Sequence, residues 1–461
     1  MRTSTAAVML ALLGGCAMVG PNFQRPAVEL PGSYGEREAG ATQAVPANWW
    51  TLYRDPALDR LMDAGFRNNS DLRIAVARIE EAEALLREAN AVLVPEVDLS
   101  AAGARTRAST RTGTLPASVA PIRNNFALTA NTSFELDFWG RLRRAAEAAR
   151  AQYLASRYGQ DVVTLTLSSA IAQTYFGLRS LDAQVLVSQE SLKSAEETLD
   201  LARRRFNAGL ISELDVNQAA ASRAQLAAQV SELRRQRQAT LHQLGVLTGQ
   251  LDLKLDAGDV RAVPTPPLPP AGLPSALLER RPDVRQAEAQ FASATALIGV
   301  SRAAQFPTFS LTAAVGRQSR ELDTLFGAGG GIWSIGLNAL GPIFDAGRYA
   351  ARTEQAEARA RQSAAAYEKA VRGAFREVSD ALSNVEHAAA ADTDLTERVA
   401  QARNSLKLAT LRYESGYSAY LEVLDAQRTL NDAQLAQLRN RQSFLGYTVD
   451  LMNALGGGWT P

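Results

Sequence analysis

The chain carries the segment RFNAGLISELDV at residues 205–216 and repeats it as RYESGYSAYLEV at residues 412–423. Both copies place a Gly four residues after an Arg, and both follow it with Leu, an acidic residue and Val. Recurrence of such a pattern at a separation of 207 residues indicates an internal duplication. The architecture therefore has to be one in which each half supplies the same elements.

Further pairs extend this repeat toward the N-terminus of each half. Gly140-Arg141 falls on Gly347-Arg348 at the same separation. Pro95 to Leu99 falls on Pro307 to Leu311 at a separation of 212, so the first half has a loop five residues longer. A Pro-rich run at residues 264–270 separates the halves and is typical of a stiff linker.

Each half contains a long helical seam with the periodicity of a coiled coil. Apolar or small residues recur at spacings of three and four from Ile171 to Phe206. The corresponding positions from Val378 to Tyr413 keep the pattern with one polar exception, Asp392. This pattern predicts long packed helices, each followed by a return helix. A continuous helix from Arg141 to Phe206 would be roughly 100 Å long at 1.5 Å per residue.

Segments of alternating apolar and polar residues precede each long helix. One apolar set runs from Phe126 to Leu136 and another from Val97 to Ala101; the second half repeats them from Phe309 to Val315 and from Trp333 to Leu337. This alternation predicts four half-exposed strands, long enough to cross an outer membrane. The smallest known membrane barrels have about eight strands, and open sheet edges are not tolerated in lipid. If the strands cross a membrane, several chains must therefore share one barrel.

The predicted organisation follows from these elements. It consists of a signal peptide at 1–15, an N-terminal segment at 16–56, repeat 1 at 57–262, a linker at 263–272, and repeat 2 with a C-terminal segment at 273–461. Repeat 1 holds strands within about 97–136 and long helices at about 141–247. Repeat 2 holds strands within about 309–344 and long helices at about 348–455. The fold class is thus an α+β membrane protein.

Composition excludes several classes of function. The 49 basic and 48 acidic residues give a net charge of +1, which provides no basic field for nucleic acid. A single cysteine and two histidines allow neither a disulfide framework nor a Cys/His metal cluster. We find no nucleophile–base pair or phosphate-binding loop. The sequence therefore predicts no catalytic residue, no metal site, no cofactor and no enzymatic activity.

The N-terminus has the pattern of an export signal. Arg2 precedes an apolar stretch from Ala6 to Leu13, which is too short to span a bilayer. The stretch leads into Leu13-Gly14-Gly15-Cys16, which resembles the bacterial lipobox, and Cys16 is the cysteine that would carry the covalent lipid. Ala17 follows in place of the Asp that retains lipoproteins at the inner membrane, so we expect outer-membrane sorting. The alternative is an ordinary signal peptide that happens to contain a cysteine.

Three motifs carry a resemblance to a known family over essentially the whole mature chain. They are the run from Leu273 to Arg285, the segment Gly341-Pro342-Ile343-Phe344-Asp345-Ala346-Gly347-Arg348, and the stretch from Arg412 to Arg428. They look like those of the TolC-like outer-membrane factors, in particular the lipoprotein branch that works with resistance-nodulation-division efflux pumps. The resemblance implies a homotrimer with a 12-stranded barrel, a helical tunnel through the periplasm and an equatorial domain, with residues 16–56 as the lipidated N-terminal and equatorial segment. It also implies lipid anchoring to the cell outer membrane and partnership with a periplasmic adaptor (membrane fusion protein) and the pump.

The resemblance assigns functional roles to residues at the turns of the two helical hairpins. Each turn places a Gly after a long helix, where a left-handed C-cap is needed. Gly209, Leu210, Gly416 and Tyr417 would contact the adaptor. An ordinary hairpin turn without a docking role is the alternative.

One helical turn inside the second hairpin, the resemblance implies a periplasmic gate. Spacings of four and three put Leu421, Asp425 and Arg428 on one helix face. A leucine ring and a carboxylate ring would narrow the closed tunnel, with Arg428 as a counter-charge to Asp425. The alternative is a solvated face with a weak Asp–Arg pair.

The expected function is that of a passive duct exporting small molecules such as drugs and toxic compounds. Two alternatives remain: a duct of the same fold for secreted polypeptides, and a periplasmic coiled-coil lipoprotein without a pore. The alternating strands argue against the second. The sequence does not identify the exported substrate, the particular pump and adaptor, whether the tip is closed at rest, or whether cations bridge the gate.

Overall fold

The computed structural model describes residues 18–34, 45–109, 111, 120–268 and 277–457. The chain divides into two compact units. The first comprises Met1–Ala27, Arg78–Ser156 and Gln286–Tyr367; the second comprises Val28–Ala77, Arg157–Arg285 and Glu368–Pro461. Each unit therefore contains segments from both halves of the repeat.

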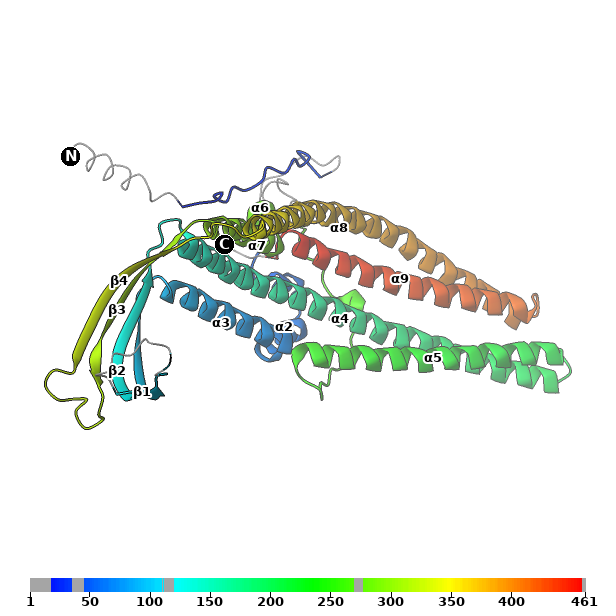
Figure 1. Ribbon diagram of the computed structural model, residues 1–461. Coiled ribbons are helices and arrows are strands. Elements are labelled where there is room, and N and C mark those ends of the chain that lie inside the picture. Colours follow the sequence, from blue (N-terminus) through cyan, green and yellow to red (C-terminus); the bar gives the residue numbers. More distant parts are fainter. Residues whose placement is uncertain (1–17, 35–44, 110, 112–119, 269–276, 458–461) are drawn as a thin grey trace. The chain divides into compact units, whose positions relative to one another are not determined.

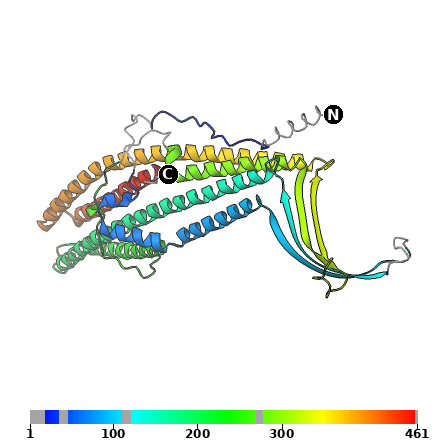
Figure 2. The same ribbon diagram turned by 90° about the vertical axis from the view of Figure 1, so that its left-hand side faces the viewer.

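The first unit is built on a four-stranded antiparallel sheet (Figures 1 and 2). Its strands are β1 (Glu96–Arg107), β2 (Ile122–Glu135), β3 (Thr308–Ser319) and β4 (Gly331–Leu340). They pair in the order β1-β2-β3-β4, so the outer edges of the sheet belong to β1 and β4. The four strands that the alternation predicts are thus confirmed.

The strand register separates an apolar face of the sheet from a polar one. Val97 pairs with Thr132, Thr132 with Ala313, and Ala313 with Ile335. The next residues along form the row Asp98, Asn131, Ala314 and Ser334, and successive residues of a strand point to opposite faces. On the first face large apolar side chains are exposed, namely Val97, Leu99, Val315, Trp333, Ile335 and Leu337. Among the described residues of this unit, no layer covers that face.

Two helices lead into the sheet and two lead out of it. Helices α3 (Ser70–Ala91) and α7 (Pro282–Ala303) precede β1 and β3, and each ends a few residues before a proline, which disfavours helical backbone in the residue ahead of it. Helices α4 (Arg141–Asn207) and α8 (Arg348–Glu414) follow β2 and β4. Each begins directly after a glycine with a positive φ, +76° at Gly140 and +82° at Gly347.

The second unit is dominated by two helical hairpins. Helix α4 returns through α5 (Glu213–Thr248), and α8 returns through α9 (Tyr420–Ala454), with each pair side by side in both views (Figures 1 and 2). The predicted seams are buried or half-buried along their length except at Phe206, which is exposed. Apolar burial along a 3–4 stripe is the principal stabilisation of such helix pairs.

Short elements pack against the hairpins in the same unit. They are the 3₁₀ helices η1 (Trp49–Tyr53) and η2 (Val260–Ala262), and the α-helix α2 (Pro56–Asn68). The four-residue helix α6 (Leu277–Arg280) precedes α7. Trp49 and Tyr53 are fully buried, and the Tyr53 ring lies 4.9 Å from that of Phe176 on α4. Residues 49–53, within the predicted segment 16–56, are therefore held to α4 by aromatic packing.

None of the helices in the described ranges has the length and apolar character needed to span a bilayer.

Candidate functional site

The two hairpin turns have the same backbone geometry. Gly209 and Gly416 adopt φ values of +73° and +79°, and each follows the last residues of a long helix. The Leu210 amide donates to the Arg205 carbonyl at 2.9 Å, and the Tyr417 amide donates to the Arg412 carbonyl at 2.8 Å. These six-to-one bonds define a Schellman C-cap, so the left-handed caps predicted at both turns are confirmed.

The candidate docking residues lie on the outer surface of these turns. Leu210 is 74% exposed and Tyr417 is 80% exposed, which is unusual for large apolar and aromatic side chains. A Cβ added at Gly209 or Gly416 would meet no atom within 4 Å. Each turn therefore presents an uncovered apolar side chain beside a backbone that is open to close approach.

The return helices begin differently at the two turns. Helix α5 starts with a capping box, in which the Ser212 hydroxyl accepts from the Asp215 amide and the Asp215 carboxylate accepts from the Ser212 amide. The corresponding N-cap of α9 is Ala419, which has no side-chain acceptor. Loss of an N-cap acceptor costs about 1 kcal/mol of helix stability, so the first turn of α9 is the less well fixed.

The candidate gate residues share the exposed face of α9. Leu421 is 59% exposed, and Asp425 and Arg428 are also exposed, whereas Tyr420 and Leu424 are buried on the opposite face. Among the residues that the structure describes, the Asp425 carboxylate and the Arg428 guanidinium form no ion pair. The single protomer thus gathers the three predicted residues on one free face, but it does not show the expected counter-charge contact.

Arg205 joins the two hairpins just inside their tips. Its guanidinium donates to the Tyr413 and Glu414 carbonyls, both at 3.1 Å, and lies 4.5 Å from the centroid of the Tyr413 ring. These carbonyls are at the C-terminal end of α8, where a cation is favoured by the helix dipole. Burial raises the pKa of the neighbouring Tyr420 phenol to about 12. The sequence pattern aligned Arg205 with Arg412 without revealing this contact, because nothing in the periodicity indicates which helix a long side chain reaches.

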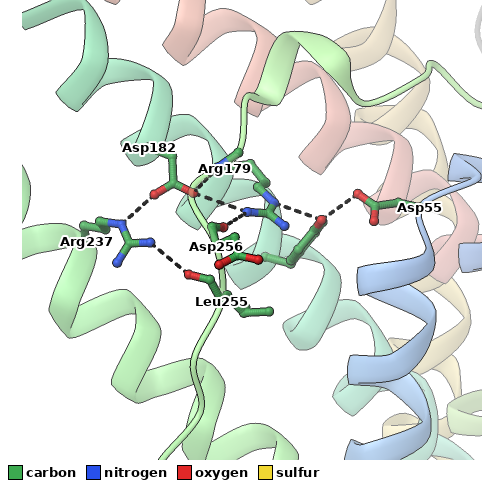
Figure 3. A network of polar contacts seen from close by, with 8 residues as sticks. Asp55, Arg179, Asp182, Arg237, Leu255 and Asp256 are labelled. Carbon is green, nitrogen blue, oxygen red and sulfur yellow. Dashed lines mark hydrogen bonds and ion pairs between the residues drawn. The ribbon is translucent and has the colours of Figure 1, made fainter.

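A second polar network lies deeper in the same unit (Figure 3). The buried Asp182 carboxylate on α4 accepts from Arg237 Nε on α5 at 2.5 Å, from Arg179 Nη1 at 3.4 Å and from the Gly258 amide at 2.9 Å. Arg237 also donates to the Leu255 carbonyl. The irregular segment around residues 255–258 is therefore tied to both helices of the first hairpin.

The same network reaches the start of α2. Arg179 donates to the Tyr175 hydroxyl at 2.9 Å and to the Asp256 carbonyl at 2.6 Å, and the Tyr175 hydroxyl donates to Asp55 at 2.5 Å. Burial and the hydrogen bond to Asp55 raise the pKa of Tyr175 above its ordinary value, so it remains a donor at neutral pH. Asp55 also accepts from the Ala57 amide as the N-cap of α2. The start of α2 and the segment around residues 255–258 are thus both anchored to α4 by charge-assisted hydrogen bonds.

Two further predictions concern the lipidated cysteine and metal binding. Cys16 lies outside the described residues. Within the described ranges, no group of three His, Cys, Asp or Glu side chains is arranged to hold a metal ion.

The chain matches the model of the outer membrane efflux protein family in two stretches, residues 63–250 and 273–457. These stretches correspond to the two halves of the repeat. The solvent efflux pump outer membrane protein SrpC of Pseudomonas putida is 36% identical over 466 residues, covering 98% of this chain and 97% of the relative. The cation efflux system protein CusC of Escherichia coli is 33% identical over 462 residues, with 98% and 97% covered.

The fold is similar to that of solved outer membrane channels. The open state of the MtrE outer membrane channel of Neisseria gonorrhoeae matches with a TM-score of 0.84 and 29% identity, over 96% of this chain and 98% of that one. Proteins of this family conduct compounds out of the cell and catalyse no reaction. The duplicated sequence, the matching fold and the two family matches together show that the chain belongs to the outer membrane efflux protein family.

Proposed function

We propose that three copies of this chain form one passive efflux duct, with a shared 12-stranded barrel in the outer membrane. The observation that carries this proposal is the four-stranded sheet, whose edge strands β1 and β4 have no further strand partner in the described part of the chain and which has one exposed apolar face. Unpaired edges cannot face lipid, and about eight strands are needed to close a barrel. A cyclic assembly in which β4 of one copy pairs with β1 of the next satisfies both requirements.

The sheet faces support this orientation in the membrane. The face with Val97, Val315, Trp333 and Ile335 would contact lipid, and the face with Asn131 and Ser334 would line the water-filled interior. A covalent lipid on Cys16 would add a second anchor to the same membrane. The long helices would continue the duct into the periplasm.

The hairpin turns are proposed as the docking surface for a periplasmic adaptor that joins the duct to an inner-membrane resistance-nodulation-division pump. Support comes from the exposed Leu210 and Tyr417 side chains and from the open backbone at Gly209 and Gly416. Such uncovered apolar side chains on a rigid turn are suited to protein contact.

The exposed face of α9 is proposed as the gate. Three copies of Asp425 around a threefold axis would repel one another, and three copies of Leu421 would form an apolar constriction. The second tip is favoured as the mobile one because its return helix lacks the capping box that fixes α5. The repulsion would be relieved either by opening or by a cation.

Small molecules are the proposed cargo. Relatives at 33–36% identity are named for efflux of toluene, of solvents and of cations. These cargoes differ widely in polarity. Such variety is expected if the pump, and not the duct, determines which compounds are exported. A duct for secreted polypeptides would share the fold, and export assays with each paired pump would separate the two.

A pair of adjacent substitutions in β4 tests the proposal. Ile335→Arg puts a charge on the proposed lipid face, where it costs about 2–4 kcal/mol at the bilayer midplane, and Ser334→Arg puts the same charge on the proposed interior face. We expect native mass spectrometry and planar-bilayer recording to find conducting trimers for the wild type and Ser334→Arg. Ile335→Arg should greatly reduce insertion. Equal membrane insertion of the two variants, or a wild type that is monomeric and does not conduct, would contradict the proposal.

A further inference from the structure

A groove in the first unit is lined by residues of α4, α7 and α8. Its volume is about 640 Å³, within the range of small-ligand sites. Most of the lining residues are polar, among them Gln152 from α4, Gln290 from α7, and Gln355 and Gln362 from α8. Helices α7 and α8 run together in Figures 1 and 2.

The charged side chains lining this groove are both cationic. Arg352 and Arg359 are exposed on α8, and the described lining includes no carboxylate. Two nearby carboxylates are already engaged: Glu357 pairs with Arg302 at 2.6 Å, and Glu288 pairs with Arg25 at 2.7 Å. Within the described part of the chain, neither Arg352 nor Arg359 has an ion pair, although Arg352 lies 5.7 Å from the Tyr349 ring centroid.

The walls of the groove are fixed by packing and hydrogen bonds. Ile298 on α7 packs against Ala356 and Ala360 of α8. The Ser293 hydroxyl donates to the Ala148 carbonyl of α4 at 3.0 Å. The groove is therefore a built feature of the three helices.

We propose that this groove binds an anionic phosphate group through Arg352 and Arg359. The two arginines are seven positions apart in α8, so they share one helix face about 10.5 Å apart along the axis. Long guanidinium side chains can converge on one anion from that distance or hold two linked anions. The planar N–H fork of Arg matches phosphate oxygens bidentately, and the glutamine amides can donate further hydrogen bonds.

The position in the chain allows two sources of this phosphate. Arg352 lies one helical turn after the start of α8, which follows β4. If the sheet crosses the outer membrane, the groove lies near the headgroups of its inner leaflet, and a phospholipid headgroup is one source. A soluble phosphate-bearing compound in water is the other.

The test uses the assembled full-length protein in detergent with two probes, inorganic phosphate and dihexanoyl phosphatidylglycerol, each followed by ³¹P NMR line broadening and calorimetry. We expect wild-type protein to bind at least one probe, with weaker binding as NaCl is raised because the arginines are exposed. The double variant Arg352→Gln with Arg359→Gln should bind at least tenfold more weakly. Arg361→Gln, an exposed arginine on the same helix outside the groove, should bind like the wild type.

The outcomes separate the sources. Binding of the short-chain lipid alone supports a headgroup site, and binding of inorganic phosphate supports a site for soluble phosphates as well. Binding of neither probe, or equal binding by wild type and double variant, overturns the proposal. If the glutamine variant fails to assemble, Arg352→Lys with Arg359→Lys keeps the charges and should weaken binding through loss of the planar forks; unchanged binding by that variant overturns it. Conductance of the same samples tests the duct independently, since the groove lies within one protomer.

Discussion

Replacing Asp182 by alanine should release the segment that crosses the first hairpin at residues 251–263. The Asp182 side chain is 1% exposed and accepts from Arg237, from Arg179 and from the Gly258 amide (Figure 3). Truncation removes the anion and leaves two guanidinium groups facing each other in a poorly hydrated space. The main-chain amide of Gly258 loses its acceptor at the same time.

The expected cost follows from the remaining contacts. Breaking a buried ion pair by removing one partner costs about 3–5 kcal/mol. Arg179 keeps the Tyr175 hydroxyl and the Asp256 carbonyl, and Arg237 keeps the Leu255 carbonyl. Partial compensation of this kind favours the lower end, about 3 kcal/mol. At 1.36 kcal/mol per tenfold change, the local opening equilibrium should rise by about two orders of magnitude.

Amide hydrogen exchange measured by mass spectrometry on the intact protein provides the assay. Peptides that cover residues 251–263 should exchange roughly 100-fold faster in Asp182→Ala, whereas peptides in the middle of α9 should change little. Asp252→Ala is the matched control, because Asp252 lies in the same segment and is exposed. An acceleration below about fivefold, or the same acceleration in the control, would refute the view that Asp182 holds this segment.

Three further perturbations follow from named contacts. Burial raises the pKa of Asp450 above 3.8, so the folded state binds the proton more tightly than the unfolded state does, and this contribution to stability is lost as pH rises through the raised pKa. Asp450→Asn should therefore have a higher thermal-unfolding temperature than the wild type at pH 7, and the two temperatures should become equal below about pH 4. Gly416→Trp should abolish drug export without changing the trimer mass, whereas Gly373→Trp, also with open space at its Cβ, should export normally; normal export by Gly416→Trp would exclude docking there. Asp425→Ala should alter closed-state single-channel conductance and Asp432→Ala should not, and an unchanged value for the first would remove Asp425 from the gate.

Elements of this fold that rest on local periodicity could be predicted from the sequence. The strands around Val97 and Ile335 could be predicted because one face of each strand is apolar. The long helices could be predicted because their apolar residues recur at spacings of three and four. The positions of Gly209 and Gly416 likewise followed from a local rule, since a left-handed C-cap favours glycine. In each case the residues that determine the structure are neighbours along the chain.

Contacts between distant side chains were not predictable in the same way. Asp392 interrupts the second seam, and the sequence offers no reason for it. In the structure, its charge acts on Arg441 of α9, which is 49 positions later in the chain. Burial lowers the pKa of Arg441, and the negative charge of Asp392 opposes this by raising it. The hydrogen bonds from Arg205 to the carbonyls of Tyr413 and Glu414 were equally unpredictable, because every residue has a main-chain carbonyl and the sequence does not indicate which one is the acceptor.

The two tips show why a repeat predicts shape better than mechanism. Gly209 and Gly416 give both turns the same left-handed cap, so duplication preserved the backbone. The next helical N-cap differs, with Ser212 in one copy and Ala419 in the other, and only the first has a capping box. A difference of about 1 kcal/mol at one helix start is too small to change the fold, yet it changes the fraction of time for which that helix end is frayed by about fivefold. A missing N-cap at the second tip would therefore let one hairpin move while the other stays fixed, with the least disturbance to the shared fold.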